Sequence, residues 1–263
     1  MSSRISRRQA LSWALASSAL GCRSGNQPAP PASASASASV RPWGGLDIAS
    51  VTQLREDERG GALVVLLHGF GAHGDDLVSL AQSLERPRTR FILPVAPISL
   101  GGGARAWWSL DAANRPRYVS DPDSAPAPPS AELAAARVAV QGVLATAAQR
   151  YAPDQLLLAG FSQGAMLALD VALTASPAPS RVALLSGALL VEAAARFEAP
   201  RETRPALFIS HGRQDRRLPF SGAEGMKAAL EAHGFPVTWR PFEGGHEIPE
   251  PIVAELQSFL FGA

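Results

Sequence analysis

The sequence predicts an α/β fold in which helices cover both faces of a mainly parallel sheet. Apolar runs of strand length recur along the chain, and stretches with helical patterning separate them. The chain has 263 residues, of which 46% are hydrophobic and 18% are charged. A chain of this length and composition buries a sizeable core, which excludes a wholly disordered protein.

Each predicted strand is a short run of leucine and β-branched side chains, as in 63–67, which is typical of a strand covered on both faces. Further strands are predicted at 90–95, 156–159, 182–185, 206–210 and 237–241, and 48–55 is expected to add an antiparallel edge strand. Helices are predicted at about 75–86, 131–150, 163–175, 221–233 and 249–261. Strands that alternate with helices in this way favour parallel pairing.

Residues 1–21 are predicted to be an export signal. Three arginines precede an apolar run over 10–20, which is too short to span a bilayer stably. The small residues before Cys22 resemble the lipobox of bacterial lipoproteins, in which that cysteine is acylated, and residues 6–11 resemble a twin-arginine signal. An ordinary signal peptide with a chance cysteine is the alternative. The lipobox predicts an exported protein, held to a bacterial membrane by a lipid on Cys22 and facing the periplasm or the cell surface.

Residues 22–42 are predicted to form a flexible tether, because proline, alanine and serine dominate and offer no apolar face to bury. A single folded domain is then expected over 43–263. The net charge of +1 gives no basis for a partner chosen by charge, such as a nucleic acid. The single cysteine excludes an internal disulfide framework and a cysteine-based zinc cluster.

Polar or glycine-rich segments follow four of the predicted strands. They are 68–71 (His-Gly-Phe-Gly), 160–164 (Gly-Phe-Ser-Gln-Gly), 211–215 (His-Gly-Arg-Gln-Asp) and 244–246 (Gly-Gly-His). The carboxyl ends of parallel strands meet at one edge of a sheet, where ligand sites gather in folds of this class. The sequence therefore predicts a functional site at that edge.

Ser162 is the predicted nucleophile. It is the serine of a Gly-x-Ser-x-Gly segment that has a predicted strand before it and a predicted helix after it. Glycines on either side let the strand and the helix meet in a sharp turn, which exposes the hydroxyl at the helix N-terminus. The alternative is that Ser162 only caps the helix that begins at Gln163.

A serine hydroxyl attacks a carbonyl only when a base removes its proton, and His246 is the predicted base. It follows two glycines after the last predicted strand, so it can reach over the end of the sheet. The other histidines are expected to orient strand-end turns (His68 and His211), to end a helix (His233), or to lie in solvent or at the rim of the site (His73).

The imidazole of the base needs an acid that fixes its tautomer. Asp215 follows the penultimate predicted strand and lies between Ser162 and His246 in the chain, which is the order found in α/β-hydrolases. Asp154 precedes the central strand at the wrong end, and Asp170 lies two turns along the helix that follows Ser162. Asp215 is therefore the predicted acid.

The tetrahedral intermediate of acyl transfer carries an oxyanion that needs two N–H donors. The backbone amide of Gln163, directly after the nucleophile, is one predicted donor. The amide of Phe70 is the other, since the glycines beside it let that loop approach closely, and the ring of Phe70 is expected to border the acyl group. A plain glycine turn is the alternative for 68–71.

Together the four segments resemble the phospholipase/carboxylesterase family, which includes acyl-protein thioesterases. The likeness spans about 63–261 and implies an α/β-hydrolase fold, a catalytic triad and an oxyanion hole, with no metal or organic cofactor. The residues concerned are Ser162, Asp215 and His246 for the triad, and the amides of Phe70 and Gln163 for the oxyanion hole.

Residues 105–111 contain Trp107 and Trp108 and resemble an aromatic segment that bacterial members of this family carry near the acyl site. The resemblance implies that both indoles line the substrate pocket, and packing at the edge of the core is the alternative. The chain departs from this mostly intracellular family in its export signal and tether. A proline-rich insert at 121–130 is expected to alter the rim of the pocket.

We therefore expect a serine hydrolase that cleaves carboxylic esters through an acyl-enzyme, with thioesters as a second substrate class. Its substrate is expected to be a small molecule. The alternatives are an exported depolymerase or feruloyl-type esterase of the same fold, and a surface-anchored binding protein that has lost its chemistry. An intact set of nucleophile, acid and base argues against the binding protein.

Overall fold

The computed structural model describes residues 43–262 except 44, 53, 112–113, 115–116, 120–129 and 201–203. The predicted export signal (1–21) and the predicted tether (22–42), including Cys22, lie outside the described residues, as does most of the predicted insert at 121–130. The description of the fold therefore concerns the residues from Trp43 onward.

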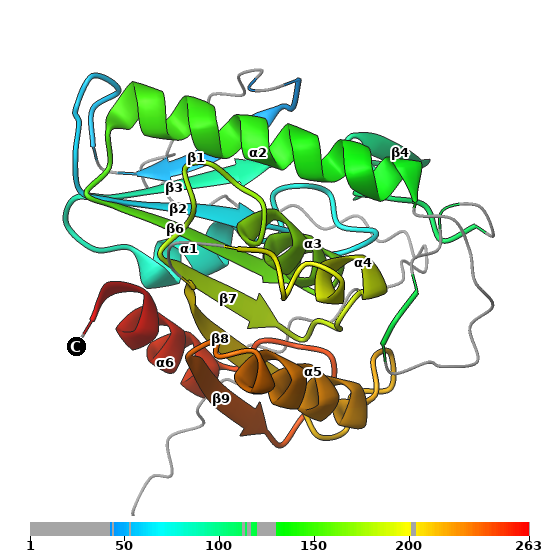
Figure 1. Ribbon diagram of the computed structural model, residues 1–263. Helices are drawn as coiled ribbons and strands as arrows, with labels where there is room; N and C mark the ends of the chain where they lie inside the picture. The colour runs from blue at the N-terminus through cyan, green and yellow to red at the C-terminus, as the bar shows by residue number, and fades with distance from the viewer. Residues whose placement is uncertain are drawn as a thin grey trace, which may run out of the picture.

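Seven strands form the central sheet of this domain (Figure 1). They are β1 (Ile48–Thr52), β2 (Ala62–Leu67), β3 (Thr89–Pro94), β6 (Gln155–Phe161), β7 (Arg181–Leu185), β8 (Ala206–Gly212) and β9 (Val237–Phe242). Their order across the sheet is β1-β3-β2-β6-β7-β8-β9. β1 runs antiparallel to β3, whereas the other neighbouring pairs are parallel. The predicted parallel sheet with an antiparallel edge strand is confirmed.

Helices cover both faces of the sheet. One layer contains α2 (Ala131–Tyr151), α3 (Gln163–Ala172), α4 (Val191–Ala194) and α5 (Phe220–Ala232), and the other contains α1 (Val78–Leu84) and α6 (Glu250–Phe261). The side chains of β2 alternate between the two: Leu63, Val65 and Leu67 join the first core cluster, and Val64 and Leu66 join the second. A strand covered on both faces is apolar at every position, which explains its sequence.

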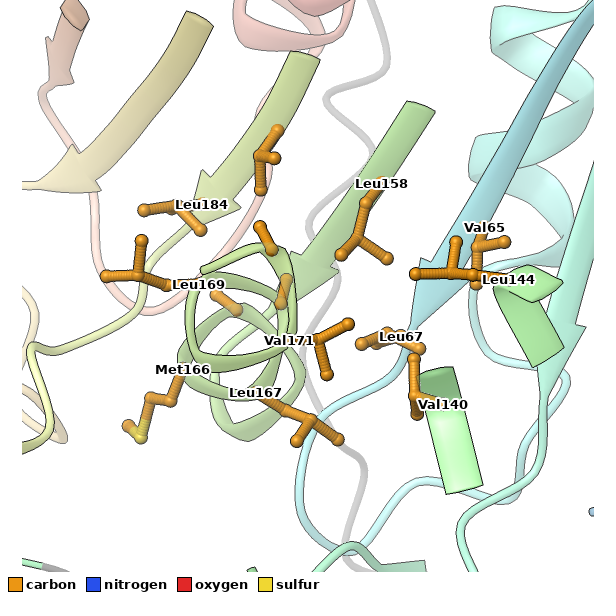
Figure 2. Packing of buried hydrophobic residues seen from close by; sticks show 14 of the residues in the cluster. Val65, Leu67, Val140, Leu144, Leu158, Met166, Leu167, Leu169, Val171 and Leu184 are labelled. Carbon is orange, nitrogen blue, oxygen red and sulfur yellow. The ribbon is translucent and has the colours of Figure 1, made fainter. Parts of the chain in front are cut away.

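Helix α3 lies against the middle of the sheet and is buried at every position (Figure 2). Leu169 lies on the side of α3 that is nearer Leu184 of β7, and Val171 lies on the side that is nearer Leu67 of β2. Each such leucine stabilises the fold by about 1.5–3 kcal/mol through the apolar surface that it removes from water. The helix that follows Ser162 is therefore held firmly in the core.

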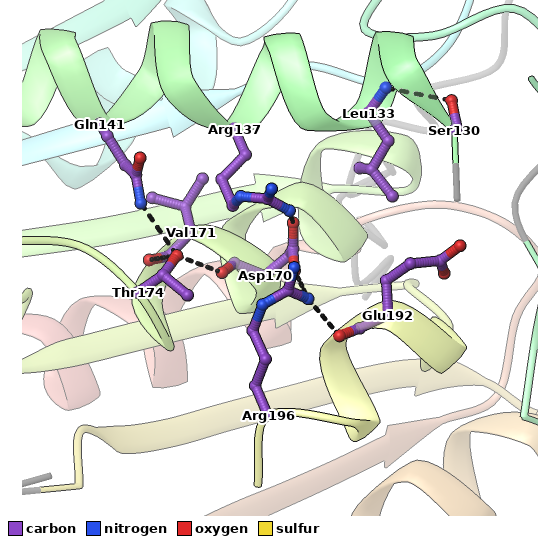
Figure 3. Close-up of polar contacts among 9 residues, drawn as sticks. All are labelled: Ser130, Leu133, Arg137, Gln141, Asp170, Val171, Thr174, Glu192 and Arg196. Carbon is purple, nitrogen blue, oxygen red and sulfur yellow. Dashed lines mark hydrogen bonds and ion pairs between the residues drawn. The ribbon is translucent and has the colours of Figure 1, made fainter. Parts of the chain in front are cut away.

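Asp170 of α3 has no exposed surface and is neutralised by two arginines (Figure 3). Its Oδ2 accepts a hydrogen bond from Arg137 of α2 at 2.9 Å, and its Oδ1 accepts one from Arg196, which follows α4, at 2.6 Å. A buried carboxylate without such partners would be strongly destabilising. The cluster joins α2 and α3 to the segment after α4, and it leaves Asp170 unavailable as an acid beside Ser162.

Helix α2 is long and apolar enough to cross a membrane, judged by length and composition alone. In this fold its buried face includes Leu133, Val140, Leu144 and Tyr151, all of which belong to the core cluster that covers the sheet. A helix that packs by one face in this way is typical of a layer of a folded domain.

Two features were not predicted from the sequence. β4 (Ile98–Gly101) and β5 (Ala104–Ala106) pair as an antiparallel hairpin, and α4 is a four-residue helix. These elements are too short to carry a periodic pattern of apolar residues. The hairpin matters for the site, because Arg105 exchanges backbone hydrogen bonds with Gly71 and Ala72 in the loop after β2.

Candidate active site

The candidate site lies where β2 and β6 end side by side. The chain continues from β2 to β3 on one side of this pair, and from β6 to β7, β8 and β9 on the other. Such a reversal opens a crevice at the carboxyl ends of the strands. Gly69 follows β2 and Ser162 follows β6, and a Cβ added to Gly69 would lie 3.3 Å from the Cβ of Ser162. Two of the four predicted segments thus meet directly.

Ser162 adopts a backbone conformation that L-residues rarely take, with φ 54° and ψ −118°. The flanking glycines make this turn possible: a Cβ on Gly160 would lie 2.2 Å from the carbonyl oxygen of Gly164, and a Cβ on Gly164 would lie 2.1 Å from that of Leu67. Helix α3 begins at the next residue, and the Ser162 side chain makes no capping hydrogen bond. Its hydroxyl is therefore not engaged as a helix cap.

Gly164→Ala is expected to destabilise the domain by about 3 kcal/mol or more, because the backbone of β2 cannot move away from the added methyl group. Gly225→Ala is the matched control, since Gly225 lies within α5 and an added Cβ there meets nothing within 4 Å. That change is expected to stabilise the domain by about 0.5–1 kcal/mol. Urea unfolding of the two variants measures both effects, and equal stabilities would contradict this account of the turn.

Three side chains from distant segments come within hydrogen-bonding distance. Nε2 of His246 lies 2.8 Å from Oγ of Ser162, and Nδ1 of His246 lies 2.7 Å from Oδ2 of Asp215. An ionised carboxylate only accepts hydrogen bonds, so Nδ1 carries the proton and Nε2 is left to accept the serine proton. The ring of Phe161 packs against the imidazole with 4.9 Å between ring centroids, which restricts its rotation.

The side chain of Asp215 is fully covered and makes several hydrogen bonds. Oδ1 accepts the amides of Arg217 and Leu218 at 2.8 and 3.0 Å, while Oδ2 faces His246 and also lies 3.2 Å from Nε2 of His211. Burial alone would raise the pKa of Asp215. The hydrogen bonds from His211, His246 and Leu218 outweigh burial and hold that pKa well below its ordinary value.

This lowered pKa predicts a loss of stability in acid. The unfolded chain binds a proton at Asp215 below about pH 4, whereas the folded chain resists protonation there, so acid favours unfolding. We expect the difference in unfolding free energy between the natural chain and Asp215→Asn to shrink as the pH falls below about 4. Urea unfolding of both proteins over a pH series measures it. A difference that stays constant with pH would contradict the prediction.

His211 takes part in this site, although the sequence indicated only a role in a turn. Its Nε2 lies 2.9 Å from the carbonyl oxygen of Leu218 and 3.2 Å from Asp215, and because both are acceptors Nε2 carries a proton. The ring has no exposed surface, and within the described part of the chain Nδ1 has no hydrogen-bond partner. The only sequence signal for this contact was that His211 precedes Asp215 by four residues. In a loop, unlike in a helix, that spacing does not bring two side chains together.

The two predicted oxyanion donors are available for a ligand. Gln163 is the first residue of α3, where backbone N–H groups have no partner within the helix. The N–H of Phe70 likewise has no hydrogen-bond acceptor among the described residues.

His68 holds the peptide that carries the Phe70 N–H. Its Nδ1 donates to the carbonyl oxygen of Gly69 at 2.9 Å, and its Nε2 accepts from the amide of Ala96 at 3.0 Å. In a trans peptide the C=O and N–H groups point in opposite directions, so fixing the Gly69 carbonyl also fixes the Phe70 N–H. Burial lowers the pKa of His68, which favours the neutral ring that this arrangement requires.

Trp107 and Trp108 do not line the pocket, which corrects the expectation from the resemblance. Both indoles are fully buried, and neither borders the cavity at Ser162. The side chain of Gln163 accepts from the amide of Trp107 at 2.9 Å and donates to the carbonyl of Trp108 at 2.8 Å, while Trp107 Nε1 donates to the carbonyl of His68 at 2.9 Å. These hydrogen bonds hold the segment against the core. The two indoles therefore pack in the core, which was the alternative to lining the pocket.

The remaining candidates lie away from Ser162. His233 ends α5, with Nδ1 2.7 Å from the carbonyl oxygen of Ala229, as predicted for a helix-end histidine. His73 is exposed, and Asp154 accepts the amide of Gly61 before the start of β6. None of the three borders the cavity at Ser162.

A cavity of about 590 Å³ opens at Ser162 and His246. Its apolar lining comes from Phe70, Leu77, Leu80, Phe161 and Ile248. Within the described ranges, no three histidine, cysteine, aspartate or glutamate residues gather in a way that would hold a metal ion. The arrangement offers a hydroxyl, an imidazole, a carboxylate and two N–H donors beside an apolar space, which is what acyl transfer requires.

The phospholipase/carboxylesterase family matches this chain over residues 47–261. The chain belongs to this family. It is 26% identical over 216 residues to acyl-protein thioesterase 1 of Gibberella zeae, an alignment that covers 76% of this chain and 89% of that protein. The phospholipase/carboxylesterase assignment agrees with the predicted α/β-hydrolase fold.

Solved structures agree with membership of the phospholipase/carboxylesterase family. The crystal structure of esterase PE8 superposes with a TM-score of 0.68 at 28% identity, covering 82% of this chain and 97% of that one. A carboxylesterase from Mesorhizobium loti shares the fold, with a TM-score of 0.63 at 20% identity over 83% of this chain and 95% of that one. The α/β-hydrolase fold and the class of carboxylic ester hydrolase, both predicted from the sequence, are confirmed at the level of the family.

Proposed function

We propose that this chain is a serine hydrolase that cleaves carboxylic esters through an acyl-enzyme, with Ser162, His246 and Asp215 as its catalytic triad. The observation that carries the proposal is the position of the His246 ring, with one nitrogen 2.8 Å from the Ser162 hydroxyl and the other 2.7 Å from the Asp215 carboxylate. Membership of the phospholipase/carboxylesterase family supports the same reaction class.

In the first half of the reaction, Oγ of Ser162 attacks the ester carbonyl while its proton passes to Nε2 of His246. The oxyanion that forms accepts hydrogen bonds from the amides of Phe70 and Gln163. Asp215 stabilises the imidazolium through Nδ1. The C–O bond to the alcohol then breaks, and His246 returns the proton to the departing oxygen, which leaves Ser162 acylated.

In the second half, water gives a proton to Nε2 of His246 and attacks the acyl carbon. The bond from Ser162 Oγ to the acyl group breaks, and the proton returns from His246 to the serine. The products are a carboxylic acid and the free enzyme. Thioesters follow the same steps with sulfur as the departing atom, and the likeness to an acyl-protein thioesterase supports them as a second substrate class.

A fluorophosphonate probe and a substrate panel test this proposal together. The probe should modify one site, which peptide mass spectrometry should map to Ser162, and the protein should hydrolyse p-nitrophenyl esters and an acyl thioester. A non-catalytic binding protein would take up no probe. A depolymerase or feruloyl-type esterase would turn over polymeric or feruloyl esters in preference to simple acyl esters, so those substrates belong in the panel.

We further propose that the chain is exported and anchored by a lipid on Cys22. Three arginines and a short apolar run before this cysteine support the proposal, and the stretch at 22–42 has the composition of a tether between the anchor and the hydrolase domain.

Export and anchoring predict that the full chain, expressed in bacteria supplied with a palmitate analogue, carries the label in the membrane fraction. Cys22→Ser removes the acylated thiol, so both the label and the membrane association should be lost. A natural chain that stays unlabelled in the soluble fraction would contradict the anchor.

A further inference from the structure

The cavity at Ser162 has chemically different walls on its two sides. Phe70, Leu77 and Leu80 come from the segment after β2, and they are apolar. Gln214, Arg216 and Arg217 come from the segment after β8 and line the same cavity, so this wall is polar and carries two arginines. β6, which carries Ser162, lies between β2 and β8 in the sheet. A substrate bound across Ser162 therefore meets an apolar wall on one side and cationic groups on the other.

The two guanidinium groups are free to bind a ligand. Arg216 and Arg217 are exposed, and within the described part of the chain neither side chain forms an ion pair or a hydrogen bond. The neighbouring Arg213 differs, because its Nε lies 3.3 Å from Glu243 and its guanidinium stacks over the ring of Phe220. The same loop thus carries one arginine that is engaged within the protein and two exposed arginines that line the cavity.

The half-buried acidic residues of the cavity wall, Asp76 and Glu247, have other partners. Asp76 accepts the backbone amides of His73 and Gly74 at 2.6 and 3.1 Å, and Glu247 accepts the amide of Gly245 at 3.1 Å. Each carboxylate is therefore tied to its own turn. The arginine pair keeps its hydrogen-bond donors for a bound anion.

The backbone of the arginine pair is fixed to the catalytic acid. The amides of Arg217 and Leu218 donate to Oδ1 of Asp215, and the Leu218 carbonyl accepts from His211. The amide of Gln214 donates to the carbonyl of Gly244 at 2.9 Å, which joins this loop to the one that carries His246. The backbone of both arginines is therefore held in place next to Asp215, the partner of His246.

This position decides which part of the substrate the arginines meet. His246 delivers its proton to the departing oxygen or sulfur, so the leaving group lies on the His246 side of Ser162. The loop of Arg216 and Arg217 is on that side, whereas the apolar wall after β2 lies across Ser162. The acyl chain fits the apolar wall, and the leaving group extends toward the arginines.

We infer that Arg216 and Arg217 bind a carboxylate or phosphate group on the alcohol or thiol part of the substrate, so that the enzyme selects apolar acyl esters with anionic leaving groups. The inference rests on the proposed ester hydrolysis. It adds a specificity-determining pair of residues to the catalytic groups, and it names the chemistry of the leaving group.

Three butyrate esters test this pairing: those of 4-hydroxybenzoate, 4-hydroxyphenyl phosphate and 4-hydroxybenzamide, which present a carboxylate, a phosphate and a neutral amide. The quantity measured is the ratio of kcat/KM for each anionic ester to kcat/KM for the neutral ester. Comparing this ratio between proteins cancels the intrinsic reactivity of the esters. The proteins are the natural chain, the double variant R216Q/R217Q, and R213Q as the matched control.

The ratio is expected to fall about tenfold in R216Q/R217Q, since two charge-assisted contacts are lost at a partly solvated site. It should be unchanged in R213Q, and in the natural chain it should fall as salt is added. A fall for either anion supports the inference and identifies which oxyanion binds. Hydrolysis of all three esters with the same ratio in the double variant as in the natural chain overturns the inference alone. Hydrolysis of none of them by the natural chain overturns the proposed function as well.

Discussion

Ser162→Ala is expected to lower kcat for ester hydrolysis by about 10⁵-fold or more. The methyl group of alanine cannot attack the carbonyl, so no acyl-enzyme forms, and the imidazole of His246 loses the group from which it takes a proton. The oxyanion donors remain in this variant, because the amides of Phe70 and Gln163 belong to the backbone. A small rate above the uncatalysed reaction should therefore survive.

Steady-state kinetics on one p-nitrophenyl ester measures this effect, and fluorophosphonate labelling provides a second readout that does not depend on turnover. Ser221→Ala is the matched control, because Ser221 is an exposed serine of α5 and does not border the cavity. The control should keep its activity and its label. A Ser162→Ala variant that still took up the probe would show that another residue is the nucleophile.

Asp215→Asn is expected to lower kcat by about 10⁴-fold while the fold is kept. The asparagine amide can donate to Nδ1 of His246, which favours the tautomer with its proton on Nε2. That nitrogen then has no lone pair for the Ser162 proton. The loss arises from the wrong tautomer and from the missing negative charge that stabilises the imidazolium.

Kinetics at neutral pH, with circular dichroism to verify folding, measures this loss. Asp154→Asn is the matched control, since Asp154 accepts a backbone amide at the opposite end of β6 and does not line the cavity. It should keep near-natural activity. If Asp215→Asn retained more than about a tenth of kcat, the carboxylate would not be the partner of the base.

The three residues of the proposed triad could be picked out from the sequence because each follows a strand, and parallel strands bring their carboxyl ends to one edge of the sheet. Ser162 had the strongest sequence signal, since its flanking glycines are required by backbone contacts as short as 2.1 Å. His246 was identified by comparing the five histidines of the chain, and Asp215 by its position between Ser162 and His246 in the chain. These inferences depend on local pattern and topology, which a sequence displays directly.

The errors and omissions concern contacts that only the assembled fold decides. Trp107 and Trp108 are equally apolar whether they line a pocket or fill a core, and the hydrogen bonds from Gln163 that turn them inward come from another segment. His211 was correctly placed at a turn, but its approach to Asp215 depends on how residues 212–218 fold back. The β4–β5 hairpin was missed because it is short and rich in glycine.

With Ser162 and His246 in the proposed triad, the order of the strands makes catalysis depend on nearly the whole domain. Ser162 and His246 are 84 positions apart, and their strands, β6 and β9, are separated in the sheet by β7 and β8. An incomplete molecule in which β9 has not yet docked can carry the serine on its turn and still have no proton acceptor. With the proposed triad, turnover reports on completed folding, because a chain whose last strand, β9, has not docked lacks the base that Ser162 needs.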